Sequence, residues 1–541
     1  MKTIQAVLYL LLAVCLHAQS PIVSPILNKQ STKLYRIAGR VVDSISGEPV
    51  CRATVVILST KNDHVLQAVS TDEDGRFAME GLPAAKYQLI ASKRGYRTAP
   101  YEQHDRYTSA IVTGEGQDTE KVNFRLDPEA TLRIEVTDDN GDPVDKARIM
   151  VFRRNLGDGF GDRVEEIDQV TAVEDGLLEY TTVPIGQYYV AVAAKPWYAM
   201  HSAALPGHKA NPALDVAYPV TFFGDTTDEA AATLIQLAAG SHEHVAIHLH
   251  AVPALHLRVP FPKSQQDRIS MPKLQRTVFG SKLKDEEALF PENAENGMEE
   301  FVGVAPGSYE LSQDDPPRIL ALNATGDQEI SANTGTLAVA VEGTIRNASG
   351  VVLPTDLELV LHWTDWAHPR EPLRSAIGDG RFAFSAVLPG AWEMWAESRG
   401  KKLSVISNAV NGTTHPNSLL TVADHPLSVA VTYVSGETRV EGFALKDGKG
   451  LAGAMVVLVP RNPGVNTVLF RRDQSDSDGS FALVDAAPGQ YTVVAIEDGW
   501  DLDWAKPEVI GRYLALGIGV TIGTHAEKMI HLSQPIPVQA R

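Results

Sequence analysis

A run of histidines is the most prominent group of candidate metal ligands in the sequence. Its members all occupy even positions: His242, His244, His248, His250 and His256. Apolar residues occupy odd positions in the same stretch: Val245, Ile247, Leu249, Leu255 and Leu257. Because successive side chains of a β-strand point to opposite faces, this pattern predicts a strand with one buried apolar face and one face lined by histidines.

Imidazoles two residues apart on a strand can bind Zn²⁺, Cu²⁺ or Ni²⁺. Pro253 is expected to interrupt the strand before His256, and Glu243 points to the wrong face to complete a site. A solvated histidine face is the preferred interpretation, and no cofactor is expected. The candidate metal ligands are His242, His244, His248 and His250.

Aromatic pairs are the second group with potential chemistry, since an exposed aromatic face can stack on a sugar ring. Trp363 and Trp366 are expected to project together from a loop. Trp392 occupies the position of a repeated core aromatic, whereas Trp500 and Trp504 are expected to pin a C-terminal helix to its domain. The candidate carbohydrate-binding residues are Trp363, Trp366, Trp197 and Tyr198.

Two further patterns resemble metal sites without completing them. His368 and Glu371 have the spacing of a zinc-peptidase motif, but strand patterns surround them, so we interpret the match as a coincidence. The aspartates before Gly479 resemble a calcium loop, yet Gln474 takes a ligand position and the closing Glu is missing, so a turn is expected. Nucleophile elbows, phosphate loops and zincin motifs are absent from the sequence, and the chain is not expected to be an enzyme.

The elements that carry these residues follow a repeated pattern. Each copy combines an Asp-Gly turn, an apolar strand, a Pro-Gly-like turn and an aromatic residue that opens an alternating strand. The third copy lacks the Asp-Gly turn. The copies are spaced by about 80 to 120 residues, which is the length of a small domain. The opening aromatics are Tyr87, Tyr188, Tyr309, Trp392 and Tyr491.

The strands of each copy alternate between apolar and polar residues. Residues 87–91 alternate after the Pro-Gly-like turn, 132–151 form two strands around a polar turn, and 122–126 close the first copy. Many short strands with regular turns predict an all-β fold of tandem immunoglobulin- or prealbumin-like β-sandwiches. Short helices are expected only as decorations, over residues 230–237 and from Pro507 to Leu514.

These patterns divide the 541-residue chain into segments. Residues 1–18 are typical of a secretory signal peptide, and residues 19–34 are expected to be a linker. Cleavage after Ala18 would leave Cys51 as the last cysteine, so each domain must be held by its own hydrophobic core. The expected sandwiches are residues 35–127, 128–252, 253–335 (divergent), 336–434 and 435–541.

Composition limits the classes of function. Hydrophobic residues make up 44% and charged residues 21%, as in ordinary globular proteins. A formal net charge of −19 and the lack of a basic run argue against nucleic acid as a partner. After signal cleavage no apolar segment is long enough to span a membrane. The chain is expected to be exported, to the periplasm, the cell surface or the medium.

The motifs of residues 39–91 resemble those of the carboxypeptidase regulatory-like family. They are G-x-V-x-D, G-x-P-V-x-x-A-x-V, T-D-x-x-G-x-F and L-P-x-x-x-Y-x-L, and residues 440–500 match nearly as well. The resemblance implies a seven-stranded prealbumin-like (transthyretin-like) sandwich, similar to the carbohydrate-binding-like fold, without the peptidase itself. The whole chain is similar to long secreted acidobacterial proteins that carry several such copies.

Together these features predict an exported, non-enzymatic structural or interaction protein of the cell envelope. Tandem sandwiches are expected to form a rod whose end loops carry the contacts. The alternative is a carbohydrate-binding protein that uses exposed aromatics on the sandwich loops. The expected partners are polysaccharides or envelope proteins, and the oligomeric state is left open.

Overall fold

The structure is a computed structural model, and part of the chain is described in it. The expected signal peptide, Trp366 and His368 lie outside the described residues. The described residues are 33–61, 63–155, 163–171, 176–181, 183–202, 211–260, 272–283, 292–295, 298–314, 317–331, 334–365, 370–436, 438–523 and 528–541. Within them the chain is nearly all-β in several sheets, which confirms the predicted fold class.

Each copy of the repeat forms its own buried cluster of apolar side chains. We use sandwiches 1 to 5 for the units built around these clusters; the domain boundaries given above stay a prediction. The clusters lie within residues 37–126, 130–249, 255–330, 338–433 and 440–536.

Sandwich 1 shows the arrangement that the other sandwiches share. Strand β1 pairs antiparallel with β4 and parallel with β8, while β2 pairs with β5 in the second sheet. The alternating burial of β5 places Tyr87, Leu89 and Ala91 in the core, as predicted. The strands are β1 (Tyr35–Asp43), β2 (Thr54–Ser59), β3 (Val65–Ser70), β4 (Arg76–Leu82), β5 (Lys86–Lys93), β6 (Tyr96–Pro100), β7 (Ile111–Val112) and β8 (Val122–Leu126).

Sandwiches 2 and 3 repeat this order, although sandwich 3 lacks the Asp-Gly turn in its sequence. Their first strands again pair antiparallel with one strand (β9 with β12, β19 with β23) and parallel with another (β9 with β17, β19 with β26). Sandwich 2 contains β9 (Thr131–Asp138), β10 (Arg148–Asn155), β11 (Arg163–Thr171), β12 (Leu177–Tyr180), β13 (Gly186–Ala193), β14 (Val216–Ala217), β15 (Thr221–Phe222), β16 (Ile235–Leu237), β17 (His242–Leu249) and β18 (Val252–Pro253). Sandwich 3 contains β19 (Leu255–Pro260), β20 (Lys273–Val278), β21 (Ser281–Lys282), β22 (Glu292–Glu295), β23 (Met298–Val304), β24 (Gly307–Asp314), β25 (Pro317–Ala324), β26 (Gln328–Glu329) and β27 (Thr336–Leu337).

In sandwiches 4 and 5 an additional strand joins the two sheets. Strand β33 pairs with both β32 and β36, and β45 pairs with both β37 and β42. Sandwich 4 contains β28 (Val339–Asn347), β29 (Glu358–Trp363), β30 (Leu373–Ala376), β31 (Arg381–Val387), β32 (Gly390–Ser398), β33 (Lys401–Val410), β34 (Thr413–His415), β35 (Leu419–Val422) and β36 (Leu427–Val434). Sandwich 5 contains β37 (Thr438–Lys446), β38 (Lys449–Gly450), β39 (Met455–Pro460), β40 (Arg471–Gln474), β41 (Ser480–Ala486), β42 (Gly489–Ile496), β43 (Ile518–Ile522), β44 (Met529–His531) and β45 (Ile536–Gln539).

The aromatic residue that opens the alternating strand has the same contact in all five sandwiches. Its ring is buried in the core, and its polar atom donates a hydrogen bond to the carbonyl four residues earlier. This contact fixes the Pro-Gly-like turn against the strand and satisfies both buried polar groups. The pairs are Tyr87–Pro83, Tyr188–Pro184, Tyr309–Ala305, Trp392–Leu388 and Tyr491–Ala487.

The two expected helices have different outcomes. The helix predicted over residues 230–237 is wrong: a single 3₁₀ turn, Glu229–Ala231, is capped by Asp228, and Ile235–Leu237 is strand β16, which pairs with β13. At the C-terminal side α1 (Pro507–Ile510) continues into the 3₁₀ helix Gly511–Leu516 as expected. The side chains of Trp500 and Trp504 are buried beside this helix.

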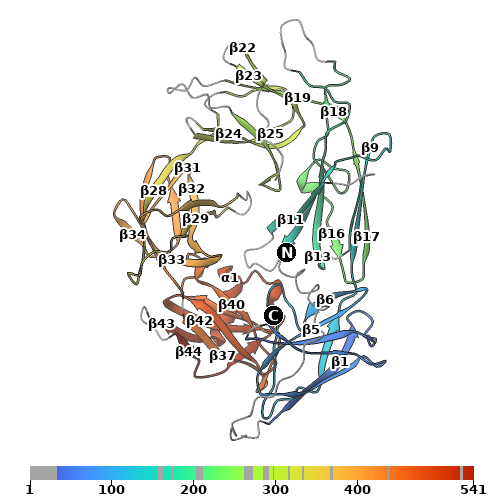
Figure 1. The fold of residues 1–541 in the computed structure, drawn as a ribbon. Coiled ribbons are helices and arrows are strands. Elements are labelled where there is room, and N and C mark those ends of the chain that lie inside the picture. The colour runs from blue at the N-terminus through green and yellow to red at the C-terminus, as the bar shows by residue number, and fades with distance from the viewer. Residues whose placement is uncertain are drawn as a thin grey trace, which may run out of the picture.

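The sandwiches close into a ring, so the expected rod is wrong (Figure 1). Sandwich 1, at the blue end of the chain, lies beside sandwich 5, at the red end. A salt bridge between Lys86 and Asp476 and a set of hydrogen bonds join them. Direct bonds also join neighbouring sandwiches, such as Arg370 of sandwich 4 with Glu310 of sandwich 3.

The contact between sandwiches 1 and 5 consists of residues 86 and 102–112 against residues 474–480, and we call it the ring-closing interface. Asp476 accepts hydrogen bonds from Lys86 Nζ (2.5 Å) and from the backbone N–H of Ala110 (2.7 Å). The buried Ser109 hydroxyl donates to the Ser475 carbonyl at 2.8 Å and accepts from Gln474 Nε2 at 2.9 Å. The turn before Gly479, which resembles a calcium loop in sequence, therefore serves as a contact between distant parts of the chain.

Candidate functional site

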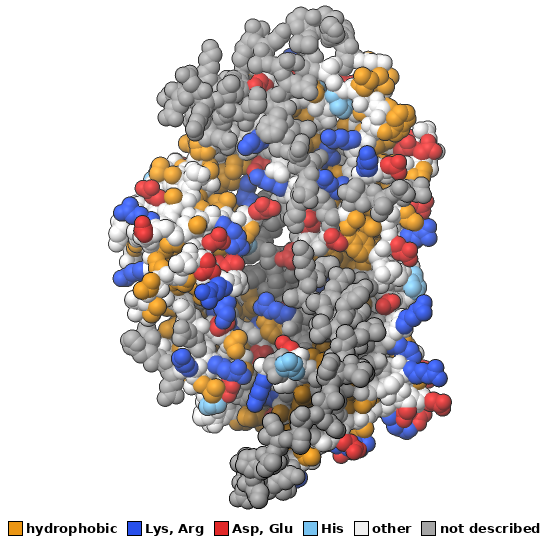
Figure 2. All heavy atoms as spheres, in the orientation of Figure 1, with side chains coloured by type: hydrophobic (Ala, Val, Ile, Leu, Met, Phe, Trp, Pro, Cys, Tyr) orange, Lys and Arg blue, Asp and Glu red, His pale blue; other side chains and the backbone are white. Residues whose placement is uncertain are grey.

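A cavity of about 790 Å³ lies where sandwiches 1, 4 and 5 meet. Sandwich 1 contributes the loop 105–107, sandwich 4 contributes residues of β29, β32 and β33, and sandwich 5 contributes β40 with the segments around it. The space-filling view is hollowed at the centre of the ring, and both basic and acidic side chains lie beside the hollow (Figure 2). This volume is typical of sites for small organic ligands.

Cationic groups outnumber anionic groups in the wall of this cavity. Five Lys and Arg side chains and three Asp and Glu side chains line it, although the whole chain carries a formal net charge of −19. The cationic residues are Arg106, Lys401, Lys402, Arg471 and Arg472, and the acidic residues are Asp105, Glu393 and Asp485.

Neighbouring strands of sandwich 4 place Lys402, Trp395 and Glu393 together. Lys402 Nζ lies 3.8 Å from the centre of the Trp395 ring, which is a close cation–π contact. Glu393 is only 7% exposed and accepts a hydrogen bond from the Thr467 hydroxyl of sandwich 5. Burial raises the pKa of the Glu393 carboxyl and lowers the pKa of the Lys402 ammonium, and their mutual attraction offsets both shifts only in part.

Sandwich 5 contributes two adjacent arginines with different surroundings. The Arg471 guanidinium donates to the carbonyls of Asp485, Val468 and Phe470 and to the Ser404 hydroxyl, at 2.7 to 3.0 Å. Arg472 instead packs over aromatic rings. Its guanidinium carbon lies 4.3 Å from the Trp504 ring centre, and the rings of Tyr107 and Trp500 lie at 5.3 and 5.8 Å.

The ring-closing interface also forms part of this cavity wall. The His104 ring stacks on Trp500 at 5.1 Å, and Tyr107 approaches the same ring at 5.3 Å. Tyr107 is thus a residue of sandwich 1 that packs against the second apolar cluster of sandwich 5. The cavity in this form therefore requires the ring to be closed.

The candidate metal ligands lie where the alternation predicts. Strand β17 buries Val245, Ile247 and Leu249 and presents the histidines to solvent. Each histidine has a separate partner, so the imidazoles do not converge. In the described part of the chain, no group of three or more His, Cys, Asp or Glu side chains could hold a metal ion. The contacts are His242–Thr131, His244–Glu135, His248–Asp225 and His250–Asp139.

The candidate sugar-stacking residues differ in exposure. Trp197 is 90% exposed and packs edge-on against the neighbouring Tyr198. The Trp363 ring packs against the core of sandwich 4, 5.0 Å from the Trp392 ring, and the Arg370 guanidinium lies over it at 5.8 Å. Trp197 is therefore the described candidate whose ring is open to a ligand.

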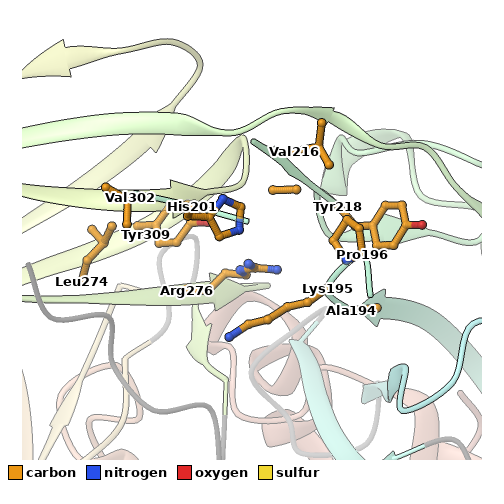
Figure 3. Close-up of a pocket in the computed structure, with 12 residues that line it drawn as sticks. Ala194, Lys195, Pro196, His201, Val216, Tyr218, Leu274, Arg276, Val302 and Tyr309 are labelled. Atoms are coloured by element: carbon orange, nitrogen blue, oxygen red, sulfur yellow. The ribbon is translucent and has the colours of Figure 1, made fainter. Parts of the chain in front are cut away.

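A second, smaller pocket of about 80 Å³ lies between sandwiches 2 and 3. Lys195 and His201 line it from sandwich 2 and Arg276 from sandwich 3 (Figure 3). Its size suits a few water molecules rather than an organic ligand.

Beside this pocket, five titratable side chains form a continuous network, in which Arg258 Nε lies 3.4 Å from a carboxyl oxygen of Glu300. Asp215 accepts from His201 Nδ1 at 2.9 Å and from His256 Nε2 at 2.8 Å, and His256 Nδ1 contacts Glu300 at 3.2 Å. Burial opposes ionisation of Asp215, but the two histidines outweigh it and lower the pKa of that carboxyl. Burial likewise opposes protonation of His256, but Asp215 and Glu300 outweigh it and raise its pKa. The network therefore favours a charged histidine between two carboxylates.

Sequence reasoning separated His256 from the other histidines but did not find its partners. Asp215 and Glu300 lie 41 and 44 residues from it in the chain and belong to no local pattern. The residues that line the larger cavity were missed for the same reason. Four adjacent basic pairs occur in the sequence, at residues 93–94, 153–154, 401–402 and 471–472, and nothing local marks the last two as cavity residues.

No helix in the described ranges is long and apolar enough to cross a membrane.

Comparisons of the whole chain with solved structures give weak likenesses. The TIE protein of Bacillus anthracis has 11% identity and a TM-score of 0.18, over 75% of this chain and 76% of that chain. A streptococcal ancillary pilin has 10% identity and a TM-score of 0.20, over 56% of this chain and 100% of that chain. Two B repeat units of the collagen binding protein of Staphylococcus aureus have 11% identity and a TM-score of 0.13, over 74% and 100%. We draw no inference about function from scores this low.

No curated protein matches this chain in sequence. One family does match a part of it, and the match begins and ends with sandwich 1. Residues 36–127 are similar to the Carboxypeptidase regulatory-like domain, as the motifs of residues 39–91 predicted.

Proposed function

We propose that this protein is an exported, non-enzymatic interaction protein of the cell envelope. In this proposal the closed ring of sandwiches is a platform that holds binding surfaces between its units. The observation that carries it is the cavity between sandwiches 1, 4 and 5, whose walls come from three units that are distant in sequence. A platform of this kind uses domain junctions, where ligand sites are common.

Two further features support the proposal. The N-terminal residues are typical of a signal peptide, which supports a location in the periplasm, at the cell surface or in the medium. The strand order of sandwich 1 recurs in the other four sandwiches, so we propose that all five derive from the carboxypeptidase regulatory-like domain. The similarity to secreted acidobacterial proteins stays a prediction.

Fractionation of the native cells tests the location, and cross-linking to polysaccharide and protein of the envelope fraction tests the interaction. We expect the protein in the envelope or the medium, cross-linked to envelope material through the closed ring. A ring-opened variant, Gln474→Ala with Asp476→Ala, should lose these cross-links, whereas the surface control Lys121→Ala should keep them. A cytoplasmic location, or equal cross-linking of the opened ring, would contradict the proposal.

Carbohydrate binding through exposed aromatics is the second candidate, and the 90% exposure of Trp197 favours it. A large indole this exposed beside Tyr198 offers a flat apolar face to a sugar ring. Affinity electrophoresis in a panel of polysaccharides should show retardation that Trp197→Ala abolishes. Val352→Ala is the matched control, because this residue is 89% exposed. Equal retardation of the Trp197 variant would rule out this surface.

A further inference from the structure

The cavity between sandwiches 1, 4 and 5 has an excess of cationic side chains in its wall, which favours binding of an anion. Its wall holds five cationic and three acidic side chains within a chain of formal net charge −19. One of the acidic groups, Glu393, is buried and hydrogen-bonded to Thr467, and burial raises the pKa of its carboxyl. Cationic walls attract anions by their summed field, most strongly where protein surrounds the site.

Uncharged groups make the close contacts of two cationic side chains of the cavity, Lys402 and Arg471. Lys402 stacks on Trp395, and no carboxylate among the described residues lies within ion-pair distance of its ammonium. The hydrogen bonds of the Arg471 guanidinium go to three carbonyls and one hydroxyl. Glu393 attracts Lys402 and Asp485 attracts Arg471, but the cationic side chains of the wall outnumber the acidic ones. An anion bound in the cavity would therefore be stabilised by several cations at once.

The rest of the wall suits an organic body rather than a bare inorganic ion. The partly exposed rings of Trp395 and Tyr107 give apolar surface, and a volume of about 790 Å³ far exceeds that of one phosphate. The side chains of Arg106 and Lys401 are exposed, so a ligand can reach the cavity from solvent.

We propose that this cavity binds a small organic anion, a molecule of roughly disaccharide size that carries carboxylate or phosphate groups on a ring-shaped body. Lys402 and the adjacent Lys401 contact the anionic group from sandwich 4, Arg472 from sandwich 5 and Arg106 from sandwich 1. Because three sandwiches supply the wall, the ligand binds the closed ring in preference to the open one and stabilises it. This site stands independently of any envelope partner of the ring.

Isothermal titration calorimetry of the mature protein tests the proposal with four probes: a hexuronate disaccharide, a disaccharide phosphate, a neutral disaccharide of the same linkage, and inorganic phosphate. We expect at least one of the two anionic sugars to bind, with an affinity that falls as salt is added. The neutral sugar should not bind. Comparing the affinities of the hexuronate disaccharide and the disaccharide phosphate shows whether the site prefers a carboxylate or a phosphate. Binding of inorganic phosphate alone, or equal binding of the neutral sugar, would overturn the proposal.

Variants of single cationic residues locate the site. Lys402→Met keeps the apolar stem over Trp395 and removes the charge, and it should weaken binding by about tenfold or more. Arg106→Ala, on an exposed loop, should weaken binding without disturbing a core. Lys121→Ala removes the same charge from a side chain that is 83% exposed elsewhere in sandwich 1, and it is the matched control. Folding is checked by circular dichroism, and unchanged affinity in both folded cavity variants would refute the assignment.

Discussion

Two junctions of this ring are held by different kinds of side-chain contact. Sandwiches 1 and 5 meet through one salt bridge and many uncharged hydrogen bonds, in which Ser109, Gln474 and Ser475 are buried. Sandwiches 2 and 3 meet beside a network of titratable groups, in which His256 lies between Asp215 and Glu300. Uncharged hydrogen bonds around one ion pair hold the first junction, whereas ion pairs of His256 hold the second.

The junctions also differ in how the chain connects their two sides. Lys86 and Asp476 are 390 residues apart, so only non-covalent contacts keep the ring closed there. His256 and Asp215 are 41 residues apart, and the short connection between their sandwiches holds the two surfaces close even when the bonds break. A short tether gives a much higher effective concentration than a long one. Loss of the first junction should therefore change the shape of the molecule, and loss of the second mainly its stability.

The largest change in the shape of the molecule is expected when contacts of the ring-closing interface are removed by mutation. Gln474→Ala with Asp476→Ala removes the acceptor of the Ala110 N–H, the ion-pair partner of Lys86 and one of the two partners of the Ser109 hydroxyl. The cost is about 1–3 kcal/mol at each of the buried groups Ser109 and Ala110, and less at Lys86, whose side chain is 40% exposed. We expect the ring to open and the radius of gyration from small-angle X-ray scattering to increase. An unchanged scattering profile for the folded variant would show that other contacts hold sandwiches 1 and 5 together.

An intermediate loss of stability is expected at the junction of sandwiches 2 and 3, and its size depends on pH. The pKa of His256 is raised, so its contribution is complete below its unfolded value of about 6.5 and is lost as pH rises through the folded value. The pKa of Asp215 is lowered, so its contribution is complete above about 3.9 and is lost as pH falls through the folded value. The network should thus stabilise most between about pH 4 and pH 6.5.

Asp215→Asn tests this dependence. It should lower the free energy of unfolding by about 1–3 kcal/mol within that window and by less above it, because a neutral amide attracts the His256 imidazolium less. Thermal unfolding of the variant and of the parent protein at several pH values measures the difference. A difference that stays constant from pH 4 to pH 9 would mean that the network acts through packing rather than charge.

The smallest change in the free energy of unfolding is expected for an exposed histidine pair, which serves as a comparison for the buried pair. His244 and Glu135 form the same kind of pair as His256 and Asp215, but their side chains are 55% and 45% exposed. His244→Ala should change the free energy of unfolding by no more than about 0.5 kcal/mol, since solvent screens the pair. A loss comparable with that of Asp215→Asn would show that the histidine face of β17 has a structural role.

Features with a local cause could be predicted from the sequence. The alternation in residues 87–91 and 245–249 placed the correct side chains in the cores, because burial on a strand has a period of two residues. The core position of Trp392 followed from its place in the repeat. The hydrogen bond from each opening aromatic to the carbonyl four residues earlier was not predicted, although its five equivalent positions were visible in the repeat.

The wrong predictions, a helix over residues 230–237 and a rod, arose where a local sequence pattern is compatible with two structures. Thr226 and Glu229 satisfy a helix-capping pattern, but the following residues instead pair with the edge of β13, because that pairing buries Ile235 and Leu237. Tandem copies were interpreted as a rod, since neighbouring units in a chain touch first. Nothing local distinguishes a rod from a ring, because closure depends on small rotations at each junction.

The sequence by itself determined the strands, the turns, the sandwich cores and the family resemblance of the first sandwich. Only the tertiary structure decided that the ring closes, that Lys402 and Arg472 face one cavity, and that His256 lies between two carboxylates. The physical reason is the range of the interactions. Burial period and turn geometry are set within a few residues, whereas polar side chains from sandwiches hundreds of residues apart meet only when every junction between them has its final angle.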